Sequence, residues 1–366
     1  MNNLDDKQPS AVIAVDAMGG DFAPDEVVLG AARASVETPI KIILVGDQSK
    51  IEPILEQTEH NPQQLEIVHT DQYITNDDKP KFILSKKPRA SMLIASQLCG
   101  TDQAHGIVSA GNTGAYILSA IKYIPRIEGV HKTAIASAYP TRNEQGRSDP
   151  FAPLLDVGAN VHCTADDLVQ LTIMGKIYAS AVKGIENPTV GLLNIGKEPY
   201  KGGDTLAEAF DMLNSIQNMK FIGNVEGNEI LKGIADIIVT EGYVGNIVMK
   251  TIEGFGETIS HIGRYAFKHR FIWMLGLLAL SSGIKQLKKV ADYSEYGGAP
   301  LLGFRKIVIK AHGRSRAKAI TNAIIVAAKT HHDNVCEKMA REIAQYEKQF
   351  QRKNVMNCDW KLNFDQ

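Results

Sequence analysis

Glycine, asparagine and charged side chains follow a series of short apolar runs in this sequence. The first run, Ala11 to Asp16, ends on an aspartate and is followed at once by Gly19 and Gly20. Such glycines allow tight turns and a close approach of the backbone to a ligand. We expect the substrate-binding residues to belong to this group, whose other members are Gly111, Asn112, Thr113, Gly114, Asp156, Asn160, Asn194, Glu198, Lys201, Asn224 and Asn246.

The string GNTG, Gly111 to Gly114, stands between an apolar run and a helix that we expect from about Ala115 to Tyr123. Backbone N–H groups at a helix start, with the Thr113 hydroxyl and the Asn112 amide, would form an anion site. The same residues suit an ordinary helix cap equally well. The sequence leaves both interpretations open.

The string GLLNIGKE, which begins at Gly191, matches most of a nucleotide-binding P-loop. Glu198 stands where that motif requires a serine or threonine for magnesium, and the residues between the glycines have the composition of a strand. No G-x-G-x-x-G follows the first apolar run, which weakens a dinucleotide-binding interpretation. We therefore expect no nucleotide cofactor.

No nucleophile motif accompanies these loops. The sequence has no G-x-S-x-G elbow, and its four cysteines show neither a C-x-x-C pair nor a zinc-like spacing. Lys197 and Lys201 are the most concentrated cations near an apolar run, where a lysine among glycines can bind phosphate or stabilise an oxyanion. Each is equally compatible with a solvated surface charge. We expect no metal, and a nucleophile that the substrate supplies.

Nine apolar runs rich in Val and Ile recur along the chain, most of them separated by segments of helix length. Continuous rather than alternating hydrophobicity predicts strands that are buried on both faces. Strand and helix in repeated alternation predict a doubly wound α/β fold with a mostly parallel sheet, whose strand ends hold the ligands. Pro24 suits the first turn of a helix. We expect a single α/β domain over 11–350, with tails at 1–10 and 351–366.

The composition excludes several classes of protein. A chain of 366 residues with 44% hydrophobic residues can bury a large core, so a disordered or fibrous protein is excluded. The net charge of -1 gives no long-range field for a nucleic acid, and we expect no nucleic-acid partner. Scattered cysteines and a polar start without an apolar signal peptide favour a reducing cytosol.

An apolar run inside the predicted insertion, at about 257–292, is flanked on both sides by Lys and Arg. It is too short to span a bilayer but suits a helix that lies on an anionic membrane surface. A buried helix or a dimer interface would have the same composition. The predicted membrane-contact residues are Phe271, Trp273, Leu275, Leu277 and Leu278.

A second basic run, Arg305 to Lys318, carries six cations in fourteen residues. Arg314 within it is a candidate ligand for phosphate, and the run as a whole could receive an acidic partner protein. A solvated strand followed by a helix start would explain it equally well.

Taken together, several strings resemble the phosphate acyltransferase family of bacterial phospholipid synthesis. The similarity runs in order from about Val12 to Ile325, through the strings VDAMGGDFAP, SAGNTGA, LDVGAN, GLLNIG followed by Glu198 and Lys201-Gly202, GNVEG, GYVGN, DYSEYGGAPLLG and AHGRS. His162 and Glu241 depart from the pattern, because the family more usually has aspartate at both positions.

The resemblance implies an enzyme that moves a fatty acyl group from acyl carrier protein to inorganic phosphate, without a cofactor. It implies an αβα sandwich similar to isopropylmalate dehydrogenases and phosphotransacetylases. It also implies a homodimer at the cytoplasmic membrane surface, with the downstream glycerol-phosphate acyltransferase as a further partner. The apolar run then becomes a membrane contact, and the basic run near Arg314 a dock for the carrier protein.

Phosphate is already an anionic nucleophile near neutral pH, so the protein needs only to supply position and charge balance. We expect Lys201 and the Asn112–Thr113 loop to hold phosphate, Asn194, Asn224 or Asn246 to stabilise the oxyanion, and Asp16 to order the site. Two alternatives stay open: a phosphotransacetylase or dehydrogenase on the same fold, and a non-catalytic membrane scaffold that recruits acyl carrier protein.

Overall fold

The strands of the protein form one continuous sheet. The computed structural model describes residues 11–142, 150–269, 280 and 297–362. Its 11-stranded sheet has the order β3-β2-β1-β4-β11-β10-β5-β6-β9-β7-β8. The strands are β1 (Ala11–Asp16), β2 (Ile40–Gly46), β3 (Leu65–His69), β4 (Gly106–Ser109), β5 (Ala134–Pro140), β6 (Phe151–Leu155), β7 (Thr189–Asn194), β8 (Lys220–Glu226), β9 (Ile237–Val239), β10 (Ala299–Leu302) and β11 (Ile307–Lys310).

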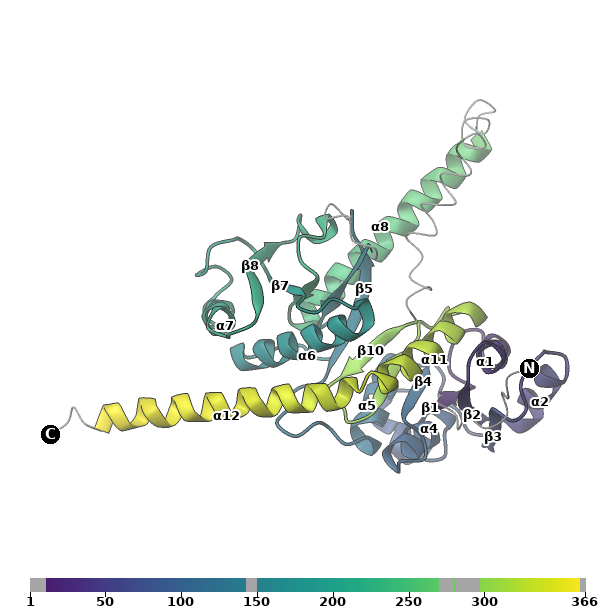
Figure 1. Cartoon of the computed structure of the whole chain (residues 1–366). Coiled ribbons are helices and arrows are strands. Elements are labelled where there is room, and N and C mark those ends of the chain that lie inside the picture. Colours follow the sequence, from purple (N-terminus) through teal and green to yellow (C-terminus); the bar gives the residue numbers. More distant parts are fainter. Residues whose placement is uncertain (1–10, 143–149, 270–279, 281–296, 363–366) are drawn as a thin grey trace, which may run out of the picture.

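Helices cover both faces of this sheet (Figure 1). They are α1 (Asp25–Glu37), α2 (Gln48–Glu56), α3 (Ile83–Lys86), α4 (Ser91–Gly100), α5 (Thr113–Tyr123), α6 (Ala165–Lys183), α7 (Asp204–Asn214), α8 (Gly242–His269), α11 (Ala317–His332) and α12 (Val335–Leu362), with short 3₁₀ turns η1 (Pro80–Phe82) and η2 (Ile230–Lys232).

All nine predicted strands are present, because each is an apolar run with almost no polar interruption. In β2, six of the seven positions are buried, as expected for a strand with helices on both faces. Strand β10 was not predicted. Strand β11 falls in the basic run, for which a solvated strand was one alternative, but its four residues are all buried.

Strands β10 and β11 lie in the middle of the sheet, where the direction of the strands reverses. β1 to β4 and β11 form one parallel half, and β6 to β9 form another. Three successive antiparallel pairings, β11 with β10, β10 with β5, and β5 with β6, join the two halves. The protein therefore has two lobes, each with its own set of strand ends.

Each half of the sheet lies between two layers. In the first lobe, one hydrophobic cluster joins β1 and β2 to α1 and α11, and a second joins the strands to α4 and α5. In the second lobe, α6 and α12 pack on one side, and residues of α8 pack with β6 and β9 on the other. The predicted αβα sandwich is confirmed (Figure 1).

Local signals place most helix boundaries. Pro24 is the N-cap of α1, one residue from the predicted start, and Thr164 forms a capping box with Asp167 at the start of α6. The boundary predicted at residue 350 falls inside α12. Within the described residues, no helix is both long and apolar enough to cross a membrane. The predicted membrane-contact residues at 271–278 lie outside the described part of the chain.

The rings of His105 and His331 stack at 4.0 Å, nearly parallel, and tie the end of α11 to the sheet. His105 Nδ1 accepts a hydrogen bond of 2.9 Å from the Val12 N–H, which requires an unprotonated nitrogen. Burial lowers the pKa of both histidines, and each ring's charge would oppose protonation of the other.

We expect the free energy of unfolding to fall as the pH drops below about 6.5, because the unfolded histidines then bind protons that the folded ones resist. His331→Phe keeps an aromatic ring in the stack and should flatten this part of a stability profile measured by urea unfolding between pH 7.5 and 5.5. His332→Phe alters the exposed neighbour and should leave the profile unchanged. An equal acid dependence in all three proteins would contradict the assignment.

Candidate functional site

Asp16 closes β1 and lies inside the protein, with 1% of its surface exposed. Its carboxylate accepts hydrogen bonds from Ser91 Oγ at 2.6 Å and Ser109 Oγ at 2.7 Å. Burial raises the pKa of Asp16, while the two serines and Lys310 act in the opposite direction. Through these bonds Asp16 links the ends of β1 and β4 to the start of α4.

Three loops of the first lobe meet beside this carboxylate. A Cβ added at Gly19 would lie 2.3 Å from Asp16 Oδ2 and 2.9 Å from the Gly111 nitrogen, so the loops after β1 and β4 touch. Gly20 has a φ of +121°, and the next residue, Asp21, donates its N–H to Gly313 O at 2.8 Å in the loop after β11. The predicted glycines thus lie together at the carboxyl ends of parallel strands, the edge of the sheet where such folds form a ligand crevice.

The start of α5 opens into this crevice. Asn112 is the N-cap of the helix, and its Oδ1 accepts the Ala115 N–H at 3.0 Å, so this side chain is a cap. Thr113 and Gly114 are exposed and belong to the first turn, whose N–H groups have no partner within a helix. Phosphate binding at GNTG would therefore use the backbone and the Thr113 hydroxyl more than the Asn112 amide.

Lys310 also belongs to this crevice, although no sequence motif had pointed to it. It closes β11 in register with Ser109, and only 8% of its surface is exposed. Its Nζ donates to the carbonyl of Ala311. Burial lowers the pKa of Lys310 to about 8, against the opposing effect of Asp16 and Asp21. The sequence does offer one signal for Lys310. Like Asp16, it stands at the end of an apolar run.

The strand ends of the second lobe are held by hydrogen bonds within the protein. Asp156, which is fully buried, accepts the N–H groups of Ile135, Gly158, Ala159 and Asn160 at 2.8 to 3.1 Å. The Asn160 amide donates to Asp156 Oδ2 and to Thr133 O. These contacts favour a structural role for both residues over the predicted contact with phosphate.

Two of the three predicted oxyanion donors are committed to the loop after β7. The Asn194 amide donates to Lys201 O, and the Asn224 amide donates to Glu198 O, both at 2.9 Å. Asn194 Oδ1 also accepts the Ile195 N–H at 2.7 Å. The two asparagines therefore set the path of the loop that carries Lys201, and each uses one amide N–H to do so.

The structure does not bring Lys201 to the GNTG loop. Lys201 lies on the second lobe, with its Nζ 5.8 Å from the centre of the Tyr200 ring. In the described part of the chain, no hydrogen bond or ion pair joins it to Asn112 or Thr113. The prediction that these residues bind phosphate together is not supported within one chain, because they end strands of different halves of the sheet.

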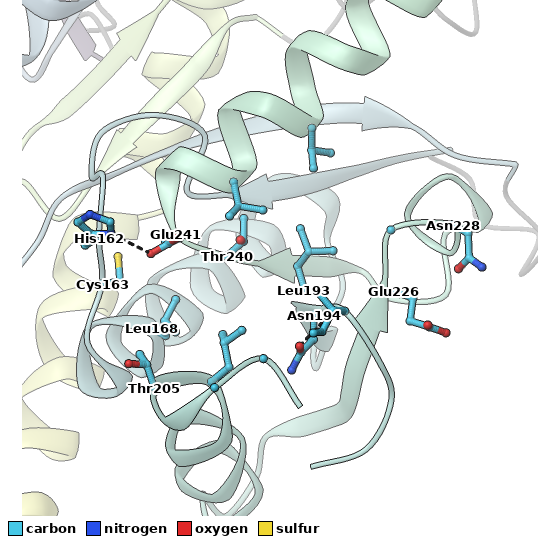
Figure 2. A pocket seen from close by; sticks show the side chains of 17 residues that line it. His162, Cys163, Leu168, Leu193, Asn194, Thr205, Glu226, Asn228, Thr240 and Glu241 are labelled. Atoms are coloured by element: carbon cyan, nitrogen blue, oxygen red, sulfur yellow. Dashed lines mark hydrogen bonds and ion pairs between the residues drawn. The ribbon is translucent and has the colours of Figure 1, made fainter. Parts of the chain in front are cut away.

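A cavity of about 980 Å³ opens at the strand ends of the second lobe (Figure 2). Its wall is largely apolar and comes from α6, β7, α7 and α8. Gly202 and Gly203, next to Lys201, form part of the rim, and Asn194, Glu226, Asn228 and Thr240 add polar groups. The apolar lining residues are Leu168, Leu193, Ile195, Leu206, Val244 and Val248.

His162 and Glu241 face each other at this cavity. Their Nδ1 and Oε2 atoms lie 3.8 Å apart (Figure 2). Cys163 lies beside them, and burial raises the pKa of its thiol to about 12. Cys99 and Cys336 are raised to about 12 in the same way. None of these three cysteines is a thiolate at neutral pH, which agrees with the absence of a nucleophile motif.

The basic run is divided between the two ends of β11. Lys306, at one end, pairs with Asp102 at 2.5 Å, and Lys310, at the other, is buried. Arg314 is exposed on the loop that follows and lies 3.4 Å from Glu257 of α8. The run is therefore not one continuous basic surface.

One group of side chains in the described residues has the composition of a metal site. His131, Asp166 and Glu347 place potential ligand atoms within 4.8 Å of one another. His131 contacts Asp166 at 3.0 Å, Tyr346 donates to Asp166, and Gln170 donates to Glu347. These bonds tie α12 to α6.

Comparison with known proteins places the chain among acyltransferases. The family model described as "Fatty acid synthesis protein" matches residues 11–338. A "Phosphate acyltransferase" of Nitratidesulfovibrio vulgaris is 40% identical over 338 residues, which cover 92% of this chain and 96% of that protein. A "Phosphate acyltransferase" of Dictyoglomus turgidum is 43% identical over 319 residues, covering 87% and 93%.

Solved structures share the fold at low identity. A phosphotransacetylase from Streptococcus pyogenes superposes with a TM-score of 0.60 at 17% identity, covering 88% of this chain and 94% of that one. A branched-chain phosphotransacylase from Enterococcus faecalis gives a TM-score of 0.54 at 15% identity, covering 88% and 99%. The predicted similarity to phosphotransacetylases is confirmed at the level of the fold.

Proposed function

Because this chain belongs to the phosphate acyltransferase family, we propose that it transfers a long-chain fatty acyl group from acyl carrier protein to inorganic phosphate. Acyl transfer to phosphate is the activity that the family name states. The product, an acyl phosphate, would serve the first acylation step of phospholipid synthesis. The observation that carries the proposal is identity of 40% over 92% of the chain.

The chemistry needs no covalent intermediate on the enzyme. A phosphate oxygen attacks the thioester carbonyl carbon, a C–O bond forms, and the C–S bond breaks as the thiolate leaves. The raised pKa of Cys163 agrees with a route in which no cysteine acts as nucleophile. The protein's task is then to hold a dianion against a thioester and to stabilise the tetrahedral oxyanion.

We assign the fatty acyl chain to the cavity of the second lobe. Its wall carries side chains such as Leu168, Leu193 and Val248, which favour an apolar ligand. Lys201 stands beside its rim, next to Gly202 and Gly203, where an ammonium group would stabilise the charge that develops on the carbonyl oxygen.

Helix α8 connects this cavity to the crevice of the first lobe. Val248 lines the cavity, and Glu257 pairs with Arg314 of the loop after β11. Nine residues of helix separate the two, which is about 13.5 Å along the axis. The acyl chain and the phosphate would thus approach the thioester from the two lobes, on either side of α8.

Asn246 is the remaining candidate for an oxyanion donor. It is exposed in the first turn of α8, beside Gly158, and no hydrogen bond engages its amide in the described structure. We expect Asn246→Ala to lower kcat at least tenfold, about 1.4 kcal/mol, without changing Tm. Asn194→Ala should instead lower Tm, because that amide braces a loop. The reverse pattern in the two variants would contradict the assignment.

The partners of this reaction are part of the proposal. One face of α8 exposes Ile247, Phe255, Ile259 and Ile262, which supports contact with a second copy of the chain. We further propose that the apolar run at 271–278 contacts an anionic membrane from the cytoplasmic side. Acyl carrier protein would dock near Arg314, and the downstream glycerol-phosphate acyltransferase would receive the product.

The decisive experiment follows the release of carrier-protein thiol from palmitoyl-acyl carrier protein, with and without inorganic phosphate. Hydroxylamine traps an acyl phosphate as hydroxamate. Phosphate-dependent thiol release with hydroxamate formation is expected. Carrier-protein binding without turnover would favour a membrane scaffold. Preference for acetyl-coenzyme A over the carrier-protein thioester would favour a phosphotransacetylase, and dependence on a nicotinamide would favour a dehydrogenase.

A further inference from the structure

The Lys310 side chain lies on the same face of the sheet as the buried polar cluster of Asp16, Ser91 and Ser109. Lys310 of β11 pairs with Ser109 of β4, and Ser109 Oγ bonds to Asp16 at the end of β1. Residues in register on parallel neighbours point to the same face of a sheet. The lysine side chain therefore extends on the face where α4 supplies Ser91 to Asp16 and where α5 begins.

The ammonium group of Lys310 has unused hydrogen-bonding capacity. An ammonium has three N–H donors, but in the described residues Lys310 donates only to the carbonyl of the adjacent Ala311. No carboxylate of those residues lies within ion-pair distance, and the Asp16 oxygens are taken by serine hydroxyls. A charged lysine with 8% exposure and no direct counter-ion carries a large desolvation cost unless a bound anion neutralises its charge.

The groups around the lysine suit a small anion. Gly111, whose N–H donates to Ser109 Oγ at 3.1 Å, leads directly into the first turn of α5. The unpaired N–H groups of that turn and the helix dipole favour negative charge. On the other side, the loops after β1 and β11 are held together by the bond from Asp21 N–H to Gly313 O.

We propose that Lys310 binds the inorganic phosphate of the reaction, together with the first-turn N–H groups of α5. This inference rests on the proposed function and replaces Lys201 as the phosphate ligand. The dianion brings the counter-charge that the lysine lacks. The nearby Asp16 carboxylate favours the charged form of the ammonium.

The inference predicts weaker phosphate binding at alkaline pH. The pKa of Lys310 is lowered to about 8, so the ammonium loses its proton above that pH. The other charged groups that face it are Asp16, Asp21 and His312. His312, with a lowered pKa, stays neutral through this range and does not change its charge.

The test compares Lys310→Met and Lys310→Arg with Lys306→Met, a lysine at the opposite end of the same strand. The phosphate KM for thiol release is measured at saturating acyl donor, and binding of inorganic phosphate is measured separately by ³¹P NMR. We expect Lys310→Met to raise the phosphate KM at least tenfold and to abolish the NMR signal of binding, with the donor KM changed less than threefold. Lys310→Arg should retain part of the affinity and extend it to higher pH. Lys306→Met should match the natural protein.

A folded Lys310→Met protein with an unchanged phosphate KM would overturn the inference. If that variant does not fold, the natural protein decides, because a phosphate KM that is constant from pH 7.5 to 9.5 would also overturn it. If the natural protein shows no phosphate-dependent thiol release, the proposed function fails. The NMR comparison still tests the inference in that case, since equal phosphate binding by the natural protein and Lys310→Met would refute it.

Discussion

Lys201→Ala is expected to lower kcat/KM by about 2 to 4 kcal/mol, or roughly 30- to 1000-fold, without loss of stability. The side chain stands beside the cavity rim, on a loop whose path is fixed by the amides of Asn194 and Asn224. A fixed loop holds the ammonium near the developing oxyanion without reorganisation, which is the condition for a large effect on the transition state. Initial rates of carrier-protein thiol release measure it.

Lys197→Ala is the matched control. Lys197 lies on the same loop, but its ammonium is exposed and pairs with Glu229 at 2.7 Å, which raises the pKa of Lys197. An exposed ion pair contributes little, so this variant should retain turnover within about threefold. Near-normal turnover of Lys201→Ala, or equal losses in the two variants, would refute a catalytic role for Lys201.

Gly245→Ala is expected to destabilise the protein by on the order of 4 kcal/mol or more. A Cβ at this position would lie 1.8 Å from the backbone oxygen of Asp156, and a backbone atom cannot move aside as a flexible side chain can. Asp156 is in turn fixed by bonds from Ile135, Gly158 and Asn160. The start of α8 would have to leave the strand ends of the second lobe, and the midpoint of urea unfolding reports the loss.

Gly254 provides the comparison within the same helix. A Cβ there meets nothing within 4 Å in the described structure. Gly254→Ala should leave the free energy of unfolding unchanged or raise it by up to about 1 kcal/mol, because alanine is the better helix former. If both variants unfolded at the same denaturant concentration, the contact between α8 and Asp156 would not be what holds the helix in place.

The sequence predicts the strands well and the use of their polar ends less well. The buried runs Ala11–Asp16 and Ile40–Gly46 are recognisable because both faces are covered, so almost every residue in them is apolar. The short strand Ile307–Lys310 was hidden by the charges around it. The mostly parallel sheet was predicted correctly, but the reversal of strand direction in its middle was not, because the pairing of β10 with β5 joins residues far apart in the chain.

The sequence predicted which residue types occur at the candidate site, but not the role of each residue. Asn194, Asn224 and Asn246 all follow apolar runs, and nothing in the sequence tells which amide is spent on the backbone of a neighbouring loop. Asp156 looks like a ligand but serves as a hydrogen-bond acceptor for the backbone. Lys310 looks like one cation among six, although burial sets it apart. Each distinction depends on tertiary contacts.

The order of the sheet also has a consequence for how the protein is made. The two strands at the centre, β10 and β11, come from residues 299–310, after every other strand of the sheet. During synthesis the two half-sheets can form, but β4 and β5 remain open edges until the last strands emerge from the ribosome. Joining the lobes is therefore a late, long-range step, and a chain that stops before residue 299 would carry two exposed edges prone to pairing with other chains.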